Sequence, residues 1–392
     1  MTTSDLTPQP MRIVGLFPEL LGIGGVQEAG RLTVAALSEI ALGRGCVADF
    51  LSINDPSGPH SLAVAGHPIS FRGFGRAKMS FVLSAIGRAF AASAKDGTTI
   101  ILAGHPNLAI PADWMQRVSR RAKTIVMAHG VEVWKPLPLF RRRGLLRANL
   151  VLAPSRDTVQ KLVGVQGVAP EKSRRLAWPL STGFLRMADA PAGLPVPSAF
   201  PKVGPVILTV GRWASSERYK GVDELIKAIP QLQMAAPGLQ LVAVGGGDDL
   251  PRLRDLSTRR GVADSVHFLE NLSREEVAAC YARADLFALP STGEGFGLVY
   301  LEAMAFSKAV VGVACGGTTD VVEDGVNGLL IPPHDAGALA DALGRLLGNE
   351  PFRTELGRRG AEIVRRKYEF SAFRAELERI LSDSSLRDEA IA

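Results

Sequence analysis

The stretch LPSTGEGFGLVYLEAMA occupies residues 289–305 and indicates the class of fold. It continues the apolar run DLFALPS (285–291), whose composition and length predict a buried β-strand. Glycines then interrupt the chain, and an apolar helical pattern begins near Leu298. A strand, a glycine-rich loop and a helix in this order predict an α/β unit.

Two carboxylates and several backbone N–H groups gather around this loop. Glu294 lies in the loop, and Glu302 lies inside the helix, about two turns on from Glu294. At that spacing the two side chains can hold hydroxyl groups at two points along one extended ligand. The first N–H groups of the helix point toward an anion or a sugar oxygen; they belong to Phe296, Gly297 and Leu298. Two solvated surface glutamates would leave the glycines unexplained.

Apolar, β-branched runs recur along the chain, each followed by a helical pattern. They are almost continuously apolar, which is typical of strands covered by helices on both faces. We therefore expect an α/β protein with two Rossmann-like, doubly wound parallel sheets of about six strands each, facing a cleft. The other strands are expected at 11–17, 46–53, 98–104, 123–130, 149–155, 174–180, 205–211, 239–246, 266–270, 309–314 and 328–333.

A stretch rich in Ala, Pro and Gly predicts the boundary between the two domains. It spans 188–202, lacks periodicity and reads as a linker. The expected domains are therefore 1–187 and 203–367. The last segment, 368–392, contains an amphipathic helix that we expect to pack back on the first domain. In open α/β sheets ligands bind beyond the carboxyl ends of the strands, so residues directly after strands are the candidates for function.

The composition excludes several classes of protein. Of 392 residues, 46% are hydrophobic and 21% charged, as in ordinary globular proteins. Cys46, Cys280 and Cys315 lie far apart, which excludes a disulfide framework and a paired-cysteine metal site. No apolar run reaches the roughly 20 residues that span a bilayer. The polar start MTTSDLTPQP is no secretory signal, so we expect a cytoplasmic protein with an irregular N-terminal tail.

The net charge of +6 is unevenly distributed. Residues 1–190 hold 23 Lys and Arg against 12 Asp and Glu, whereas the remainder is mildly acidic. This asymmetry indicates an anionic partner for the first half, such as a membrane surface, a phospholipid or a diphosphate. Solvated surface charge is the alternative. No nucleic-acid partner is expected, because aromatic residues make up only 6% and no known motif is present.

Adjacent glycines follow the first expected strand. Gly24 and Gly25 open a helix, where backbone N–H groups can approach an anion, although a tight turn alone also explains them. The full GxGxxG fingerprint is missing, and Asp55 is the one candidate for the acid that binds ribose in dinucleotide folds. NAD binding is therefore disfavoured.

Two further groups follow strands. His129 ends the strand 123–130 and can hydrogen-bond a substrate hydroxyl, or else be a satisfied buried histidine. Arg212 and Lys220 suit a diphosphate, with an exposed basic loop as the alternative. No Asp-x-Asp pair follows a strand in a position to hold Mg²⁺, so we expect no metal.

Taken with these motifs, the chain resembles the retaining glycosyltransferases of family 4, which have the two-domain GT-B fold. The resemblance covers nearly everything from Arg12 to about Leu381. Its most specific element is the Glu-x7-Glu motif, here Glu294 to Glu302, followed by a strand and the Gly316-Gly317 pair. The glycine loop and the His129-Gly130 element are weaker and consistent.

The resemblance implies a role for each matching residue. Glu302 would bind the ribose hydroxyls of a sugar nucleotide, and Glu294 the hydroxyls of the transferred sugar. His129 would lie near the anomeric carbon, and with Glu294 it forms the expected catalytic pair. The implied substrate-binding residues are Gly24 and Gly25 in the first loop, Arg212 and Lys220 on the diphosphate, Asn271 and Leu272 at the base, and Gly295, Phe296, Gly297, Leu298, Val299 and Glu302 around the sugar, the phosphate and the ribose.

Three features depart from the family pattern. Eight positions separate Arg212 from Lys220, more than the commonest family spacing. Glu270 stands where a glycine is usual, which leaves the choice of base open. Glu132 follows the His-Gly element where Asp is frequent. None of them removes a charged group that the chemistry needs.

The resemblance implies transfer of a hexose from a nucleoside-diphosphate sugar with retention of configuration, without a metal or other cofactor. The expected acceptor is a glycan or lipid-linked glycan bound by the first domain, in exopolysaccharide or glycolipid assembly. GDP-mannose is favoured as donor, because 211–221 and 294–305 look similar to bacterial polysaccharide mannosyltransferases; UDP-sugars are the close alternative.

The acceptor domain contains two stretches suited to a membrane surface. Residues 76–90 and 139–150 mix Arg and Lys with large apolar side chains, so either can lie on an anionic membrane and present a lipid-linked acceptor. The protein would then be peripheral on the inner face of the membrane, whereas a soluble acceptor is the alternative. The competing enzyme class is a sugar-nucleotide epimerase of the same two-domain architecture. A non-catalytic binder is disfavoured because every expected charged position is filled.

Overall fold

The computed structural model describes residues 11–22, 24–64, 66–93, 98–119 and 121–383. The N-terminal tail 1–10, expected to be irregular, lies outside the described residues. The chain divides into two compact units. Unit 1 comprises the chain up to Pro179 together with the segment from Phe370 onward, and unit 2 is Leu180–Glu369.

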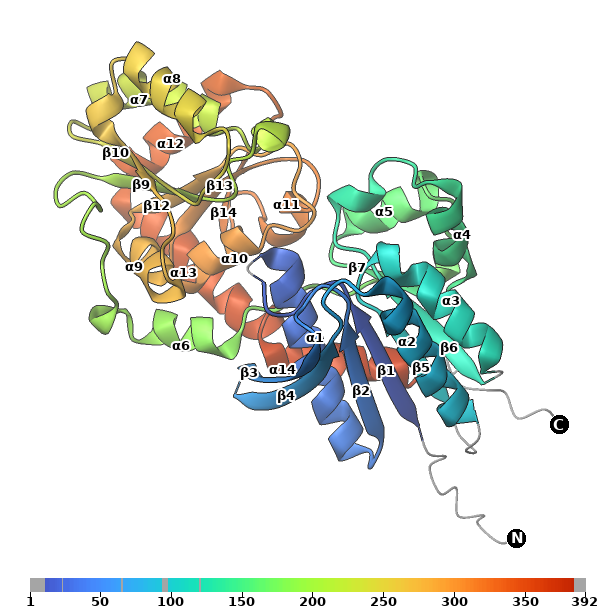
Figure 1. Ribbon diagram of the computed structural model, residues 1–392. Helices are drawn as coiled ribbons and strands as arrows, with labels where there is room; N and C mark the ends of the chain where they lie inside the picture. Colours follow the sequence, from blue (N-terminus) through green and yellow to red (C-terminus); the bar gives the residue numbers. More distant parts are fainter. Residues whose placement is uncertain (1–10, 23, 65, 94–97, 120, 384–392) are drawn as a thin grey trace, which may run out of the picture. The chain divides into compact units, whose positions relative to one another are not determined.

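In the described part of unit 1, eight strands form one sheet in the order β3-β4-β2-β1-β5-β6-β7-β8 (Figure 1). Helices α1 and α14 pack together on one face, and α2, α3 and α4 lie on the other. The strands are β1 (Arg12–Phe17), β2 (Val47–Ser52), β3 (Gly58–Val64), β4 (His67–Gly73), β5 (Thr99–Ala103), β6 (Ala122–Met127), β7 (Leu150–Ala153) and β8 (Ser173–Arg175). The helices are α1 (Gly25–Gly43), α2 (Lys78–Ser93), α3 (Ala109–Val118), α4 (Leu139–Arg147), α5 (Arg156–Gly164) and α14 (Phe370–Leu381), with 3-10 turns η1 (Pro106–Leu108), η2 (Val131–Val133) and η3 (Pro170–Lys172).

The hairpin β3–β4 corrects the expectation of about six strands, all parallel, in this sheet. It is antiparallel and pairs Ser61 with Ser70, while β4 joins β2 in parallel. Its residues alternate between exposed and covered, for example exposed Ser70 and Arg72 around buried Phe71. A search for continuous apolar runs misses such strands, because only one of their faces is fully covered.

In unit 2, the described residues form a six-stranded, fully parallel sheet in the order β11-β10-β9-β12-β13-β14. Strand β12 therefore lies between β9 and β13, which makes neighbours of the loops that follow these three strands. The strands are β9 (Val206–Val210), β10 (Gln240–Val244), β11 (Val266–Leu269), β12 (Leu286–Leu289), β13 (Ala309–Val313) and β14 (Gly328–Ile331).

Helices cover both faces of the second sheet. Helices α7, α8 and α12 lie over one face, and α9, α10 and α13 over the other (Figure 1). The bounds are α6 (Thr182–Asp189), α7 (Val222–Ala235), α8 (Leu250–Arg259), α9 (Arg274–Arg283), α10 (Leu298–Ala305), α11 (Thr318–Val321), α12 (Ala336–Gly348) and α13 (Glu350–Lys367), with 3-10 turns η4 (Pro191–Gly193), η5 (Ser215–Lys220) and η6 (Ala263–Ser265). Among the described residues of the whole chain, no helix combines the length and apolar character needed to cross a bilayer.

The division between the units falls before α6, whereas composition had placed it at 188–202. Phe184 of α6 is buried and packs edge-on against Tyr281 and Phe306 of unit 2. These aromatic contacts join α6 to the second unit, so the stretch rich in Pro and Gly begins inside unit 2.

Helix α14 belongs to unit 1 and packs on α1. Its side chains Phe373, Leu377 and Ile380 are buried. Arg44 at the end of α1 pairs with Glu378 at 3.2 Å. The amphipathic pattern of the last segment therefore reflects a packed helix that returns to the first sheet.

Candidate active site

The loop after β12 is shaped by glycines that allow close backbone approach. Gly221, at φ 73°, would place a Cβ 2.4 Å from the carbonyl oxygen of Pro290, and a Cβ on Gly293 would lie 2.5 Å from the Tyr219 ring. The N–H of Thr292 donates to the carbonyl of Tyr219 at 2.9 Å. These contacts hold the loop after β9 against the loop after β12, and larger residues at either glycine would separate them.

This contact brings Lys220 to Glu294, 74 residues further along the chain. The Lys220 Nζ lies 3.3 Å from Glu294 Oε1 and 4.0 Å from Glu217 Oε2. Glu217, which the sequence did not single out, also pairs with Arg212. The Lys220 side chain is 16% exposed and that of Arg212 is 72% exposed, so Lys220 is the more desolvated cation. Burial and the charge of Glu294 raise the pKa of the Tyr219 phenol beside them.

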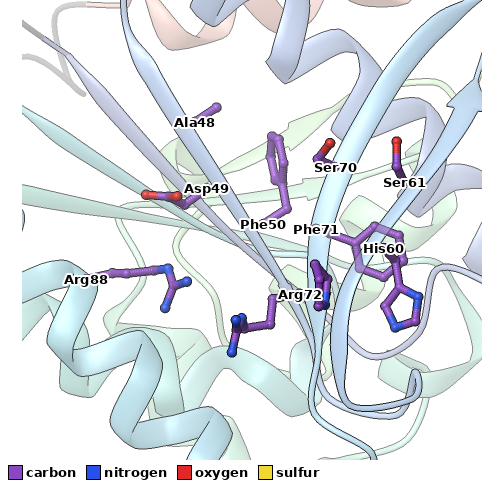
Figure 2. A pocket seen from close by; sticks show the side chains of 10 residues that line it. Ala48, Asp49, Phe50, His60, Ser61, Ser70, Phe71, Arg72 and Arg88 are labelled. Atoms are coloured by element: carbon purple, nitrogen blue, oxygen red, sulfur yellow. The ribbon is translucent and has the colours of Figure 1, made fainter.

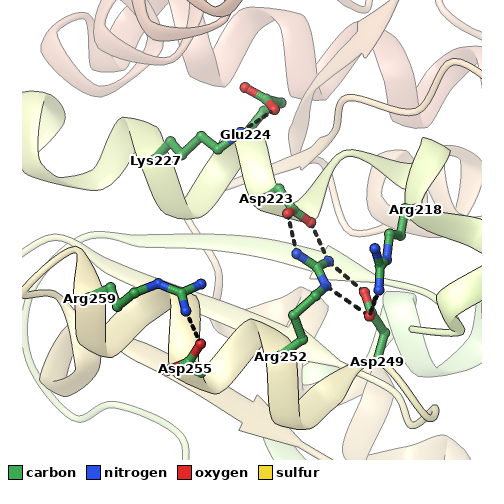
Figure 3. Close-up of polar contacts among 8 residues, drawn as sticks. All are labelled: Arg218, Asp223, Glu224, Lys227, Asp249, Arg252, Asp255 and Arg259. Atoms are coloured by element: carbon green, nitrogen blue, oxygen red, sulfur yellow. Dashed lines mark hydrogen bonds and ion pairs between the residues drawn. The ribbon is translucent and has the colours of Figure 1, made fainter.

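A network of ion pairs anchors the segment that carries Lys220 (Figure 3). Arg218 pairs with Asp249 at 3.0 Å. Arg252 of α8 bonds to both oxygens of Asp223, at 2.6 and 2.8 Å, and also to Asp249. Hydrogen bonding from Arg252 lowers the pKa of Asp249 despite its burial. The network therefore fixes η5 relative to α7 and α8, and none of its members was predicted from sequence.

The Gly316-Gly317 pair holds the backbone of the Glu294 loop from the other side. The N–H of Gly317 donates to the carbonyl of Glu294 at 2.8 Å. A Cβ on Gly317 would lie 2.4 Å from the carbonyl oxygen of Gly295. The loop is thus fixed between the segments that follow β9 and β13. Gly297, at φ 93°, ends the loop immediately before α10 begins at Leu298, followed by Val299.

Glu302 is held by a buried tyrosine. The hydroxyl of Tyr281, on α9, donates to Glu302 Oε2 at 2.8 Å. Burial, followed by the charge of Glu302, raises the pKa of Tyr281 well above its usual value, so the phenol keeps its proton and donates. Sequence spacing identified Glu302 but gave no sign of this partner on another helix.

The segment expected to contact the nucleotide base of the donor begins after β11. Asn271 has φ 56°, and it and Leu272 follow Glu270, the first residue after the strand. Glu270 pairs with Arg254 at 3.1 Å, and that guanidinium lies 5.0 Å from the centre of the Phe268 ring. Glu270, which departs from the family pattern, therefore forms a surface ion pair next to the segment expected to contact the nucleotide base.

In unit 1, His129 follows β6 and is held in one orientation. Its Nε2 lies 2.8 Å from the carbonyl oxygen of Gly104, and its backbone N–H donates to Glu132 Oε1 at 2.5 Å. Because a carbonyl only accepts, Nε2 carries the ring hydrogen and Nδ1 is left as an acceptor. Nδ1 is buried and has no hydrogen-bond partner among the described residues. Trp178 packs against the ring, with centroids 5.4 Å apart.

His105, missed in the sequence, stacks on His129 with ring centroids 5.8 Å apart. It follows β5, the strand next to β6, and its Nδ1 accepts the N–H of Asn107 at 3.1 Å. Burial, and next the neighbouring His129, lower the pKa of His105 to about 4. The pair is visible only once the strand order places the two loops side by side.

We expect His105 to make the fold less stable in mild acid. Its folded pKa of about 4 lies below the ordinary 6.5, so between these values the unfolded chain binds the extra proton. The free energy of unfolding should therefore fall as pH decreases from about 6.5 to about 4, by an amount on the order of 1–3 kcal/mol. Chemical unfolding of the wild type and of His105→Gln across this range measures the difference. His60→Gln is the control, and equal pH slopes for the wild type and His105→Gln would contradict the prediction.

The first loop of unit 1 is fixed by Asp55. This buried carboxylate accepts the N–H groups of Leu20 at 2.7 Å and Leu21 at 3.1 Å. Asp55, the one candidate for the acid that binds ribose in dinucleotide folds, therefore holds the loop that leads into α1 through these hydrogen bonds. Gly24, at φ 149°, and Gly25 are exposed where α1 begins.

Some of the predicted residues come together and others stay in separate units. Unit 2 brings together the predicted residues of the loops after β9 and β12, whereas His129, Gly24 and Gly25 belong to unit 1. Among the described residues, no group of three His, Cys, Asp or Glu side chains is arranged to hold a metal ion.

Comparison with known proteins relates this architecture to known enzymes. The family "Glycosyl transferases group 1" matches residues 195–363. The chain is 30% identical over 388 residues to a phosphatidyl-myo-inositol mannosyltransferase of Mycobacterium leprae, covering 94% of this chain and 96% of the relative. It is also 30% identical to a GDP-mannose-dependent alpha-(1-6)-phosphatidylinositol monomannoside mannosyltransferase of Mycolicibacterium smegmatis, over 70% and 74% of the two chains.

Solved structures match in fold. Sucrose-phosphate synthase of Thermosynechococcus elongatus superimposes with a TM-score of 0.72 at 23% identity, over 95% of this chain and 98% of that one. HepE of Anabaena in complex with UDP gives 0.68 at 19% identity, over 95% and 100%. Together with two parallel-sheet α/β units, these neighbours define a GT-B fold. The chain belongs to the glycosyl transferases group 1 family and is a glycosyltransferase. The epimerase alternative gains no support from these relatives.

Proposed function

We propose that this glycosyltransferase moves a mannosyl residue from GDP-mannose to an inositol-containing lipid or its glycan, with retention of configuration and without a metal. The observation that carries the proposal is the end-to-end similarity to the M. leprae phosphatidyl-myo-inositol mannosyltransferase. Other relatives support the same acceptor chemistry, among them a D-inositol 3-phosphate glycosyltransferase of Corynebacterium jeikeium, 38% identical over 39% of this chain. UDP-sugars are the alternative donors, as the UDP complex of HepE illustrates.

The residues of unit 2 have the chemistry that this reaction requires. Departure of a nucleoside diphosphate develops negative charge on phosphate while the sugar becomes oxocarbenium-like. Lys220 and Arg212 would stabilise that charge, with the N–H groups at the start of α10 beside the distal phosphate. Glu294 would hold sugar hydroxyls and Glu302 the ribose, its orientation set by Tyr281. From unit 1, His129 would offer to the transferred sugar its Nδ1, which has no hydrogen-bond partner among the described residues.

The donor is tested by binding and by turnover in EDTA. GDP-mannose at 100 times its Kd should add about 2.7 kcal/mol to the free energy of unfolding, whereas UDP-glucose at the same concentration should add little. Transfer to phosphatidylinositol, followed by NMR of the anomeric proton, reports retention. Stabilisation by UDP-sugars alone would reassign the donor, and loss of turnover in EDTA would overturn the metal-free step.

Helices α2 and α4 of unit 1 support a membrane-bound acceptor. Both contact α3 on one face of the sheet. Helix α2 exposes Met79, Leu83 and Phe90, and α4 exposes Leu139 and Phe140. Basic side chains flank them, at Arg76, Lys78, Arg141 and Arg143. Apolar side chains bordered by Lys and Arg suit an anionic bilayer surface, where the proposed lipid acceptor resides.

Replacing Leu83 and Phe90 together by Gln should weaken binding to anionic vesicles at least tenfold. The reason is the lost burial of two large apolar side chains in the interface, each about 1.5–3 kcal/mol when fully buried. Co-sedimentation with vesicles containing phosphatidylinositol measures the change. Met234→Gln removes a still more exposed apolar side chain from unit 2 and is the control. Unchanged co-sedimentation of the double variant would exclude α2 from the membrane surface.

A further inference from the structure

Unit 1 contains a hollow away from the segments described above. A cavity of about 410 Å³ lies beside β2, the β3–β4 hairpin and α2 (Figure 2). Its lining includes Arg72 of β4, Arg88 of α2 and Asp49 of β2. No residue of this cavity belongs to the predicted donor site, and only Arg88 lies in a stretch, 76–90, to which the sequence assigned a role.

The guanidinium groups of Arg72 and Arg88 approach one another across this cavity (Figure 2). Neither is in an ion pair with any described residue, and Arg88 bonds only to Ser84, one turn before it. Other arginines of unit 1 have carboxylate partners: Arg12 with Asp49, Arg31 with Glu28, Arg44 with Glu378 and Arg174 with Asp383. Arg72 and Arg88 therefore face each other without a carboxylate partner among the described residues.

The carboxylate in the cavity does not neutralise them. Asp49 pairs with Arg12 at 2.6 Å, so this pair adds no net charge beside Arg72 and Arg88. Like charges that converge in a partly enclosed space repel each other, and a bound anion removes that cost. Two guanidinium groups also have the donor geometry that matches phosphate oxygens.

Hydroxyl groups complete a set of donors. Ser61 and Ser70 are paired across the hairpin and both line the cavity. Phe50 and Phe71 alternate with Asp49, Ser70 and Arg72 along their strands, so their buried side chains lie on the other face of the sheet, where the His60 ring stacks on Phe71 with centroids 5.2 Å apart. The phosphate group of an ester fits the polar part of this lining, because the guanidinium groups and the two hydroxyls can donate hydrogen bonds to its oxygens.

We infer that Arg72 and Arg88 form a binding site for the phosphate group of a phosphate ester, separate from the donor site. The ester is carried either by a lipid headgroup at the membrane or by a soluble molecule. Helix α2 supplies Arg88 to this cavity and also exposes the apolar side chains of the proposed membrane surface, so a headgroup has a direct route to the site. The inference does not depend on which sugar is transferred or on the donor nucleotide.

Binding of myo-inositol 1-phosphate and of vesicles tests the site. Calorimetric titration of the full chain with the soluble ester should show saturable binding that weakens at least tenfold in Arg72→Gln/Arg88→Gln. Arg117→Gln/Arg147→Gln removes the same charge from side chains that share Asp113 and is the matched control. Arg88→Glu, which reverses the charge, should abolish binding. Unfolding midpoints without ligand verify that each variant folds.

The outcomes separate the two sources of phosphate. Loss of soluble-ester binding with unchanged vesicle binding identifies a free phosphate ester. Weaker co-sedimentation with phosphatidylinositol vesicles, at equal phosphatidylcholine content, identifies the headgroup. Equal binding by the wild type and both arginine variants, or no binding of either probe by the wild type, would overturn the site. Stabilisation by GDP-mannose, measured on the same variants, should not change, so a failure here differs from a failure of the proposed donor.

Discussion

Lys220→Met is expected to lower kcat for sugar transfer by about 10²–10³-fold, or about 2.7–4 kcal/mol in the barrier. The Lys220 ammonium is largely desolvated and lies 3.3 Å from Glu294, at the junction of the loops after β9 and β12. Negative charge on the departing diphosphate would develop near this group, and a fixed cation stabilises it without reorganisation. Methionine keeps the volume and removes the charge. Initial rates with saturating GDP-mannose and acceptor measure the effect.

Lys227→Met is the matched control, because Lys227 is also on unit 2 and pairs with a glutamate, Glu224, at 2.8 Å. That pair is exposed on α7, and its loss should leave kcat unchanged. Lys220→Arg keeps the charge with another geometry and should fall between the wild type and Lys220→Met. Unfolding midpoints distinguish lost catalysis from the cost of leaving Glu294 without the Lys220 cation. A wild-type kcat in Lys220→Met would show that the diphosphate is neutralised elsewhere.

The fold class was predictable because parallel strands covered on both faces are nearly continuous apolar runs. Strands such as β5 and β13 are buried at every position, and both were expected from the sequence. The GT-B class and the glycosyltransferase family are confirmed by the comparisons. The β3–β4 hairpin was missed because its covered and exposed residues alternate.

The sequence predicted the residues of the candidate site that lie in one continuous segment, but not the contacts between segments. Glu294 and Glu302 share a loop and a helix, so their spacing alone identified them. The ion pair between Lys220 and Glu294 depends on β9 and β12 being neighbours in the sheet, which no local pattern states. The same holds for the hydrogen bond from Tyr281 to Glu302 and for the stacking of His105 on His129. The roles that the resemblance implies for Glu294, Glu302 and His129 are predictions, which variants of these residues would test.

Gly317→Ala is expected to lower kcat/KM about 100-fold while the protein stays folded. The φ of Gly317 is −67°, which any residue adopts, so only the lack of space around it excludes a side chain. An added Cβ would lie 2.4 Å from the carbonyl oxygen of Gly295 and 2.6 Å from the Cα of Phe296. Both are backbone atoms, so the loop that carries Glu294 must move, and the hydrogen bond from the Gly317 N–H to the Glu294 carbonyl is strained with it.

Displacement of this loop should lower kcat/KM by more than the accompanying loss of stability explains. The overpacking should cost about 1–3 kcal/mol of unfolding free energy, whereas the loss of kcat/KM should exceed what that destabilisation explains. Gly348→Ala, at the end of α12 with nothing within 4 Å of its added Cβ, is the control and should leave both quantities near wild type. Wild-type kcat/KM in Gly317→Ala would mean that the Glu294 loop tolerates displacement. Glu294 would then not be a group whose position limits the reaction.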